Sequence, residues 1–515
     1  MIKTIVKKNN YLDSIFLMKA SKEVMHVEGV KNAVVVMGTD MNKTVLEEFG
    51  GLSEEALGAA PNDLIISVDS EDEKAAEKAV DCIHSLLTEK QEKKTEEAKE
   101  VIASLEQALE QMEESNLVMI SLPGEYAAME ARYALQKGKH VFIFSDLPIE
   151  DELELKRIGA ENNLLVMGPG AGTAVIDGVS IGLMSKVRRG TIGIVAASGS
   201  GLQEVAVLVH QMGFGISQAI GTGGRDLSKD VGGSMMLRGI RLLDKDNDTK
   251  VIVLISKPPH PETMEKIFTE IKRVEKPVVI FFLGGDTEQI KESEAYAPAT
   301  LEEAARMACD LAQGKEVKMQ DYIKMCKDEL QEIAKKEKSR MNSQQKYLRG
   351  LFCGGTHSEE AVTLLQDFVP QLHSNIRFGK SELLVNRHIS IGNSLVDMGD
   401  EEFTKGRPHP VMDPEILNDR LLQEGSDPET AVILLDILLG HAVHPDPVGC
   451  IEETIRKIQA LTQQEGRYVS VIASICGTDM DPQNYAEQER RLKELGVHIE
   501  RSNSRAAMLA GMIVC

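Results

Sequence analysis

The sequence contains no tryptophan, and aromatic residues make up only 4% of its 515 residues. Stacking platforms for bases or sugar rings are therefore not expected. Its seven cysteines lie far apart and form no Cys-x-x-Cys pair, which argues for reduced thiols and against disulfides or a structural zinc site. No apolar run approaches the roughly 18 residues of a membrane span, and the N-terminus has no signal-peptide core. We therefore predict a cytoplasmic protein with no membrane partner.

The sequence also lacks an excess of positive charge, because 81 acidic residues outnumber 58 basic ones and the formal net charge is −23. A broad basic face for nucleic-acid phosphates is not expected, so nucleic acid is excluded as a partner. A small, charged ligand held by backbone amides fits this composition better.

The pattern of apolar runs predicts an α/β protein with several domains. Runs of five or six apolar residues alternate with helical stretches from Asn116 onward, which is typical of a parallel sheet covered on both faces. The expected domains are a small α+β, ferredoxin-like module (1–70), a charged helical connector (71–115), parallel-sheet domains (116–190 and 191–320), a helical linker (321–345) and a last parallel-sheet domain (346–515).

Two of these regions resemble each other. Ser198-Gly199-Ser200 with Glu204 aligns without a gap to Gly354-Gly355-Thr356 with Glu360, and each stretch closes an apolar strand and opens an amphipathic helix. Each region also has a later strand followed by a turn with histidine and prolines, at 255–262 and 438–447. These matches predict an internal duplication, although stretches this short also match by chance.

The turn at 198–201 is the best candidate site. A strand ending in small residues leaves the first helical N–H groups unpaired, so Ser198, Gly199, Ser200 and Gly201 are expected to bind an anion such as phosphate. The structural alternative is that Ser198 only caps the helix. Gly354, Gly355 and Thr356 are predicted to form the equivalent site in the last domain.

A second glycine-rich turn follows the strand at 216–221. Gly223 and Gly224 would let backbone approach a ligand, and Arg225 could form a forked pair with a carboxylate or phosphate. A structural pair between Arg225 and Asp226 or Asp230 is the alternative. The loop at 168–173 (GPGAGT) lacks any nucleotide-binding spacing and is a weak candidate.

The last domain carries two clusters with histidine. Arg407 and His409 lie on a loop stiffened by prolines, and Gly440, His441, His444 and Asp446 follow the most apolar strand. We predict Arg407, His441 and His444 as catalytic groups for substrate binding and proton transfer, with Gly440 in the binding turn. Pro445 and Pro447 break the helix that usually presents such ligands, so no metal site is predicted. His357 and Asp397 could join either cluster.

The middle region resembles the α subunit of succinyl-CoA synthetase. The stretches at 168–183, 189–207, 212–226 and 276–285 recur there in the same order and spacing, and 431–446 resembles the β subunit. The resemblance implies a CoA-binding-like Rossmann-type domain at 116–190 and CoA-ligase-like flavodoxin-type domains at 191–320 and 346–515. The family's phosphorylated histidine loop is absent, since 286–305 contains no histidine. The glycine-rich first turn of its CoA-binding domain is absent as well.

The chain as a whole is similar to FdrA-type proteins, through stretches such as VVVMGTDMNK, IGTGGRDLSKDVGG, LFCGGTHSEEA and LGHAVHPDP. That resemblance implies one subunit of a three-component oxamate carbamoyltransferase in allantoin and purine nitrogen breakdown. The expected partners are carbamoyl phosphate or another acyl phosphate, a small carboxylate, and other subunits of the pathway. No cofactor is certain, and CoA or a nucleotide is possible. The alternatives are an acyl-CoA synthetase with another phosphate route and a non-catalytic scaffold that binds an anion.

Overall fold

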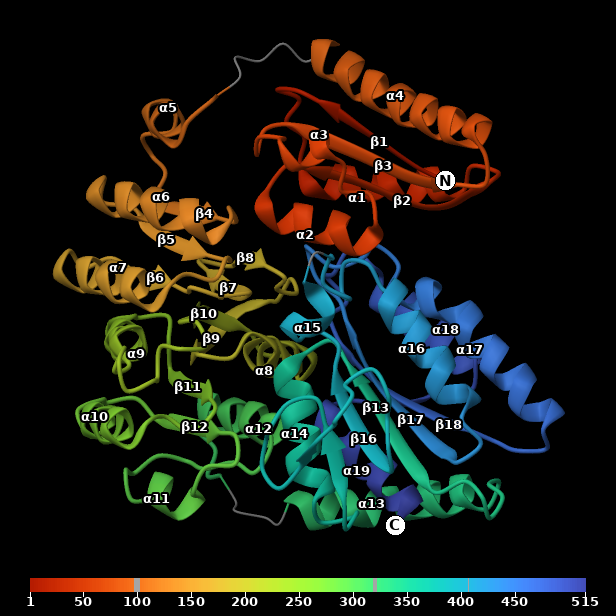
Figure 1. Cartoon of the computed structure of the whole chain (residues 1–515). Coiled ribbons are helices and arrows are strands. Elements are labelled where there is room, and N and C mark those ends of the chain that lie inside the picture. Colours follow the sequence, from red (N-terminus) through yellow and green to blue (C-terminus); the bar gives the residue numbers. More distant parts are fainter. Residues whose placement is uncertain (97–101, 318–321, 406) are drawn as a thin grey trace. The chain divides into compact units, whose positions relative to one another are not determined.

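A small antiparallel sheet lies near the N-terminus, and its central strand is almost entirely buried. In this computed structural model, residues 1–96, 102–317, 322–405 and 407–515 are described. They fall into two units, Met1–Met112 with Lys405–Pro408, and Glu113–Thr404 with His409–Cys515. The first unit contains β1 (Ile2–Lys7), α1 (Ser14–Met25), β2 (Val30–Met37), α2 (Asp40–Phe49), α3 (Glu54–Leu57), β3 (Leu64–Ser70), α4 (Glu73–Glu96) and α5 (Leu105–Gln111) (Figure 1).

The first unit confirms the predicted α+β module. Its strands lie in the order β1-β3-β2 and all pairs are antiparallel. The helix expected to be a solvated connector contributes to the core, because Ala79 and Ile83 of α4 pack with Leu17 and Val24 of α1. The first half of α4 therefore belongs to the module, while part of the charged run, 97–101, lies outside the described residues.

The second unit begins with a small parallel sheet of three strands, β4-β5-β6, within the segment expected to form a parallel-sheet domain (116–190). In the sequence of this segment, apolar strands alternate with amphipathic helices. The helices α6 and α7 cover the sheet. The elements are β4 (Leu117–Ile120), α6 (Gly124–Gln136), β5 (His140–Ile143), α7 (Ile149–Glu161) and β6 (Val166–Met167).

A six-stranded sheet follows, in the order β12-β11-β9-β10-β7-β8. Its core strands β9 to β12 are parallel, whereas β7 and β8 form an antiparallel hairpin on one edge. This hairpin, at 173–182, was expected in the preceding domain, so the sheet begins before residue 190. The elements are β7 (Thr173–Ile176), β8 (Val179–Gly182), β9 (Arg189–Ala196), α8 (Gly199–Gln211), β10 (Ile216–Gly221), α9 (Ser234–Lys245), β11 (Val251–Ser256), α10 (Pro261–Ile271), β12 (Val278–Phe282), α11 (Thr287–Lys291) and α12 (Leu301–Ala312).

The last sheet has seven parallel strands in the order β15-β14-β16-β13-β17-β18-β19. Nine consecutive buried residues in β17 show that its center is covered on both faces. The elements are α13 (Tyr322–Lys338), β13 (Tyr347–Phe352), α14 (Gly355–Leu365), β14 (Leu372–Ser374), β15 (Glu382–Leu383), β16 (Asn393–Asp397), α15 (Glu401–Thr404), α16 (Glu415–Ser426), β17 (Thr430–Leu438), α17 (Pro447–Gln464), β18 (Ser470–Cys476), α18 (Tyr485–Glu494), β19 (His498–Glu500) and α19 (Asn503–Val514).

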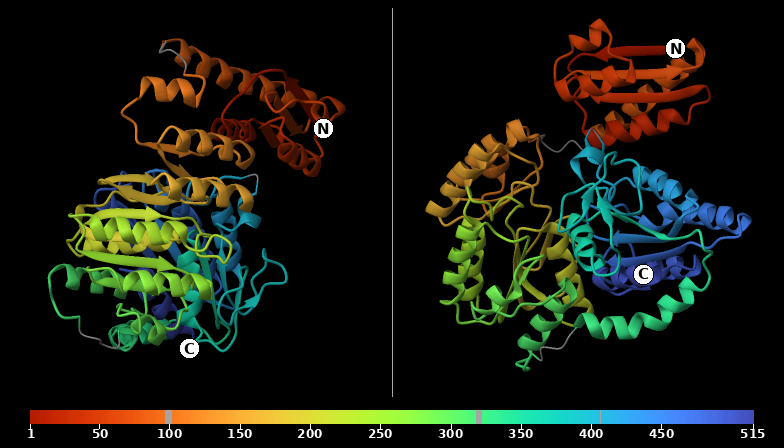
Figure 2. Two further views of the ribbon diagram at one scale, coloured as in Figure 1. Left: turned by 90° about the vertical axis from the view of Figure 1, so that its left-hand side faces the viewer. Right: turned by 60° about the horizontal axis from the view of Figure 1, so that its bottom comes forward.

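Helices pack on both faces of each large sheet (Figures 1 and 2). On the six-stranded sheet, α8 and α12 bury one face and α9 and α10 the other. On the seven-stranded sheet, α13, α14 and α19 bury one face and α16 and α17 the other. The predicted α/β class with parallel-sheet domains is confirmed. In the part of the chain that is described, no helix is long and apolar enough to cross a membrane.

Candidate functional site

The two predicted helix starts face each other. In each sheet a central strand ends in a turn of small residues, so that α8 follows β9 and α14 follows β13. The hydroxyl oxygens of Ser198 and Thr356 lie 2.6 Å apart. The Thr356 N–H also donates to the Ser200 hydroxyl at 3.1 Å. Two turns separated by more than 150 residues in the chain therefore meet in one place.

Three backbone N–H groups at this meeting point have no protein acceptor among the described residues. They belong to Gly199, Ser200 and Gly355, in the first turns of α8 and α14. Ser198 does cap its helix, because its hydroxyl accepts the Gly201 N–H at 3.0 Å, yet the cap leaves the two preceding amides unpaired. The positive ends of both helix dipoles thus converge, which favours a bound anion.

A cavity of about 480 Å³ lies at these helix starts. Small residues keep its floor open; a Cβ on Gly224, for example, would meet no atom within 4 Å. The cavity is lined by Gly170, Gly172, Thr173, Leu183, Ala197, Ser198, Gly199, Ser200, Gln203, Gly224, Lys257, Cys353, Gly354, Gly355, Thr356, Glu359, Ile376, Arg377, Asp397, Asp400, His409, Val411 and Leu438.

Charges of both signs line this cavity. Lys257, in the turn after β11, forms an ion pair with Glu359 of α14. Burial raises the pKa of Glu359, and Lys257 only partly opposes this. Burial also lowers the pKa of His409. Arg377 supplies a second cation in the lining.

Asp397 is the most perturbed acid of the lining. Burial raises its pKa, the Gly399 N–H opposes the rise, and the charges of Asp436, Asp400 and Glu359 add to it, giving a pKa of about 7. A carboxyl group with such a pKa exchanges protons at neutral pH.

Most of the predicted anion-binding residues line the cavity, but three of the predicted glycines do not. Gly201 follows Ser200 in α8, and its N–H donates to the Ser198 hydroxyl. Gly223 has a φ of 86°, and a Cβ there would lie 2.3 Å from the Pro169 carbonyl oxygen. Gly440 is buried, and its N–H and carbonyl both bond to the Gln483 amide. Gly223 and Gly440 are needed for close backbone packing, and a Cβ on Gly201 would lie 2.5 Å from the Ser198 hydroxyl oxygen. The predicted anion-binding residues that do line the cavity are Ser198, Gly199, Ser200, Gly224, Gly354, Gly355 and Thr356.

Neither predicted arginine lines the cavity. Arg225 forms an ion pair with the buried Glu152 at 2.9 Å and donates to the Leu147 carbonyl oxygen at 2.5 Å. The expected structural alternative had the wrong partner, because Asp226 pairs with Lys156 instead. Arg407 is exposed and is absent from the lining.

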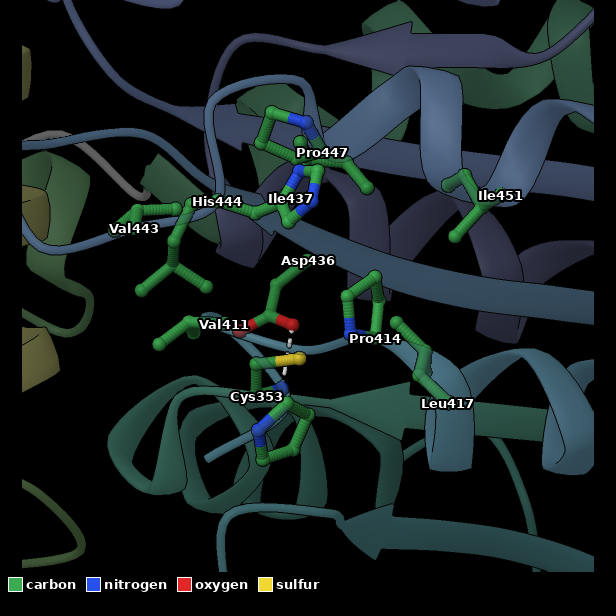
Figure 3. Close-up of a pocket in the computed structure, with 12 residues that line it drawn as sticks. Cys353, Val411, Pro414, Leu417, Asp436, Ile437, Val443, His444, Pro447 and Ile451 are labelled. Carbon is green, nitrogen blue, oxygen red and sulfur yellow. Dashed lines mark hydrogen bonds between the residues drawn. The ribbon is translucent and has the colours of Figure 1, made fainter. Parts of the chain in front are cut away.

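The two predicted catalytic histidines also lie outside the cavity. His441 is exposed. The ring of His444 accepts the Asp446 N–H at 3.1 Å and borders an adjoining apolar cavity of about 30 Å³, with Val411, Pro414 and Leu417 among its neighbors (Figure 3). Asp446 caps α17 and pairs with Arg491 at 2.8 Å. This turn therefore has a structural role in the last domain.

Asp436 of β17 positions the start of α14 through hydrogen bonds. Its carboxylate accepts the Cys353 and Gly354 N–H groups at 2.7 and 2.8 Å and contacts His357 Nδ1 at 2.9 Å; the first bond is visible in Figure 3. Burial would lower the pKa of His357, but the hydrogen bond to Asp436 and the nearby charges of Glu204 and Glu360 raise it to about 9. The imidazolium thus balances buried carboxylates.

Glu204, His357 and Cys476 are the one group in the described residues whose ligand atoms could hold a metal ion, lying within 4.8 Å of one another. His357 Nε2 lies 3.6 Å from Glu204. A metal would have to displace the proton that the raised pKa of His357 retains. The charge of this cluster is already balanced by that proton, so we assign no metal to it.

Reciprocal contacts between the domains of the six-stranded and seven-stranded sheets support the predicted duplication. Glu204 of α8 accepts the N–H of Asn503, the first residue of α19, at 3.0 Å. Its aligned counterpart, Glu360 of α14, accepts the N–H of Leu301, the first residue of α12, at 2.8 Å. Each carboxylate therefore caps the last helix of the other half. A pair of swapped, equivalent contacts is what two related domains would make about a local twofold axis.

Sequence reasoning missed several cavity residues. Lys257 lies in the 255–262 turn, which the internal comparison identified without singling out its lysine. Glu359 lies one residue before the aligned Glu360. Arg377 follows β14, a three-residue strand with no clear apolar pattern. Asp400 follows the strand that ends at Asp397, so position at a strand end was the available signal.

Family models match three parts of the chain. They are described as AllF, heavy metal-associated domain (residues 1–115), CoA binding domain (187–284) and CoA-ligase (351–513). The first segment contains a single cysteine, Cys82, so it cannot offer the paired thiolates that soft metals prefer.

The chain is 39% identical to the uncharacterized protein YahF of Escherichia coli K12, over 100% of this chain and 99% of YahF. The chain belongs to the FdrA-type family. Shorter matches join this FdrA-type chain to CoA ligases. The α subunit of succinate–CoA ligase from Aquifex aeolicus is 30% identical over 33% of this chain and 57% of that subunit. The sulfoacetate-CoA ligase subunit SqwL from Acholeplasma is 26% identical over 36% of this chain and 63% of that subunit. The chain thus spans about three fifths of these two ligase subunits.

One solved structure that matches is the dinucleotide-forming acetyl-coenzyme A synthetase 1 of Ca. Korarchaeum cryptofilum. It is 14% identical with a TM-score of 0.29, covering 77% of this chain and 82% of that one. In the FdrA-type chain, β12 leads into the short helix α11 and then to α12, and 286–305 contains no histidine that could carry phosphate.

Proposed function

We propose that this chain is a subunit of oxamate carbamoyltransferase, which converts oxamate and carbamoyl phosphate to oxalurate and phosphate. In allantoin and purine nitrogen breakdown the reaction runs toward carbamoyl phosphate. The observation that carries the proposal is the convergence of unpaired amides of Gly199, Ser200 and Gly355 on one cavity. These amides bind the phosphate group of an acyl phosphate and stabilise the charge that develops during transfer.

Two cations suit the remaining charges of the substrates. Lys257 and Arg377 line the same cavity, so they replace Arg225 and Arg407 as cationic partners, Lys257 for the acyl phosphate and Arg377 for the small carboxylate. The missing phosphohistidine agrees with this chemistry, because transfer between an acyl phosphate and an amide needs no phosphoenzyme. The AllF description of the N-terminal model supports placement in allantoin metabolism.

In this proposal the cavity must hold the two substrates side by side. Its volume of about 480 Å³ lies within the usual range for small-molecule sites. Partner subunits of the pathway complete the enzyme in this proposal.

The test is carbamoyl phosphate formation from oxalurate and phosphate by the complex reconstituted with its partner subunits. We expect turnover that depends on this chain and falls at least tenfold in Ser200→Ala with Thr356→Ala, while Thr363→Ala, two turns further along α14, leaves it unchanged. No turnover in any combination of subunits would refute the proposal.

The CoA-ligase and CoA-binding models favour one second candidate, an acyl-CoA synthetase with another phosphate route. Calorimetric titration of CoA into the full chain separates the two. Binding in the micromolar range supports the synthetase, and no heat of binding at millimolar CoA excludes it. Ordered phosphate without activity in any combination would instead indicate an anion-binding scaffold.

A further inference from the structure

Asp397 is fixed at the edge of the cavity, opposite the start of α14. It is the last residue of β16, and its backbone is held on both sides by Asn375, which accepts its N–H at 2.8 Å and donates to its carbonyl at 3.0 Å. One carboxylate oxygen, Oδ1, accepts the Gly399 N–H at 2.9 Å. The other, Oδ2, has no hydrogen-bond partner among the described residues and lies 3.0 Å from the position of a Cβ on Gly355.

The free oxygen of Asp397 therefore lies beside Gly355, whose amide is one of the three proposed to bind phosphate. Acidic groups face it from three elements, namely Asp436 of β17, Glu359 of α14 and Asp400 of its own turn. His409 lies over Gly399, and Lys257 is tied to Glu359. Burial and these charges hold the pKa of Asp397 at about 7, so both protonation states are populated near neutral pH.

Transfer to an amide nitrogen requires one proton to move. The nitrogen must lose a proton as it attacks, and phosphate takes one up as it leaves. His441 and His444 lie outside the cavity, and His409 is a poor carrier because burial lowers its pKa and its Nδ1 already accepts the Val411 N–H. Asp397 has a free oxygen 3.0 Å from the Cβ position of Gly355, whose amide is one of the three unpaired donors.

Resting on the function proposed above, we propose that Asp397 is the catalytic residue that carries this proton. In the direction of oxalurate formation, its carboxylate takes a proton from the oxamate amide nitrogen while that nitrogen forms a bond to the carbonyl carbon of carbamoyl phosphate. The bond from that carbon to the phosphate oxygen then breaks, and Asp397 returns the proton to the leaving phosphate. One proton moves from nitrogen to phosphate, and no other reactant is needed.

The charge of the residue makes the test specific. A carboxylate beside bound phosphate is repulsive, so Asp397→Asn should bind phosphate as well as or better than the parent while losing the proton carrier. A merely structural role would have the opposite signature, with a lower melting temperature and weaker binding. Positioned acid–base groups contribute about 100-fold or more to rate.

The experiment measures kcat, KM and phosphate affinity of the reconstituted complex with the parent chain, Asp397→Asn and the control Asp367→Asn, an exposed acid beyond the other end of α14. We expect kcat to fall about 100-fold in Asp397→Asn with KM unchanged or lower, and no change in Asp367→Asn. The parent rate of oxalurate formation should rise with pH through about 7, a measurement that needs no variant.

Each outcome has one reading. An active parent with kcat retained in Asp397→Asn, or with a rate independent of pH between 5.5 and 8.5 by direct assay, overturns the role of Asp397 and leaves the proposed function standing. A complex with no carbamoyl transfer at all overturns the function and the role together. A folded Asp397→Asn chain that binds phosphate but does not turn over supports the proposal.

Discussion

The hydroxyl oxygens of Ser198 and Thr356 lie 2.6 Å apart and join the first turns of two helices from different halves of the chain. The contact places the positive ends of α8 and α14 at one cavity, so a single anion can receive hydrogen bonds from both halves. The Ser200 hydroxyl also accepts the Thr356 N–H. Removing the hydroxyl of Ser198 or Thr356 should therefore change the affinity for an anion more than it changes the free energy of unfolding.

Thr356→Val tests this contact. The substitution keeps the shape of the side chain but removes the hydroxyl, and we expect inorganic phosphate to bind about 5- to 10-fold more weakly, since one hydrogen bond to a charged group contributes roughly 1.5 kcal/mol. Isothermal titration with phosphate measures it. Thr363→Val on the same helix, whose hydroxyl bonds only to a helix carbonyl, should leave the affinity unchanged; an equal loss in both variants would contradict the account.

Lys257→Gln should weaken binding of the acyl phosphate. The lysine is the cation tied to Glu359 at the cavity wall, and without it the buried Glu359 would repel phosphate. We expect KM for carbamoyl phosphate to rise at least fivefold, with kcat changed less. Lys266→Gln, an exposed lysine of α10, is the matched control. An unchanged KM in Lys257→Gln would show that the cation does not contact substrate.

Arg225→Gln should affect stability and not substrate binding. It removes a partner of the fully buried Glu152, whose other cation is Lys156. Because the guanidinium is 44% exposed, we expect a loss of about 1–2 kcal/mol in the free energy of unfolding, less than for a fully buried pair. Urea unfolding of Arg225→Gln and Arg407→Gln compares the two; a raised KM in Arg225→Gln with normal stability would return Arg225 to the site.

Stability should depend on His357 in the alkaline range. Its folded pKa of about 9 lies above the ordinary value of about 6.5. The proton is therefore held more tightly in the folded chain, so the stabilisation is fully present below about pH 6.5 and is lost as pH rises through 9. We expect the difference in unfolding free energy between the parent and His357→Gln to shrink by about 3 kcal/mol between pH 6 and pH 10. A difference that is constant with pH would mean that His357 is neutral.

Local patterns in the sequence identified the helix starts, because strand, small-residue turn and amphipathic helix are all encoded within about 20 residues. The fold class followed from the same runs. Pairings between distant residues could not be read in this way. Arg225, for example, is paired with Glu152 of α7. Asp397 and Lys257 come to one cavity only because two sheets, each ordered by its own topology, meet along α8 and α14.

The crystal structure of the full chain with carbamoyl phosphate tests the central claim most directly. The account predicts phosphate oxygens within hydrogen-bond distance of the Gly199, Ser200 and Gly355 N–H groups, with the carbamoyl group toward Asp397. Carbamoyl phosphate bound elsewhere, or these amides left without ligand at saturating concentration, would contradict it.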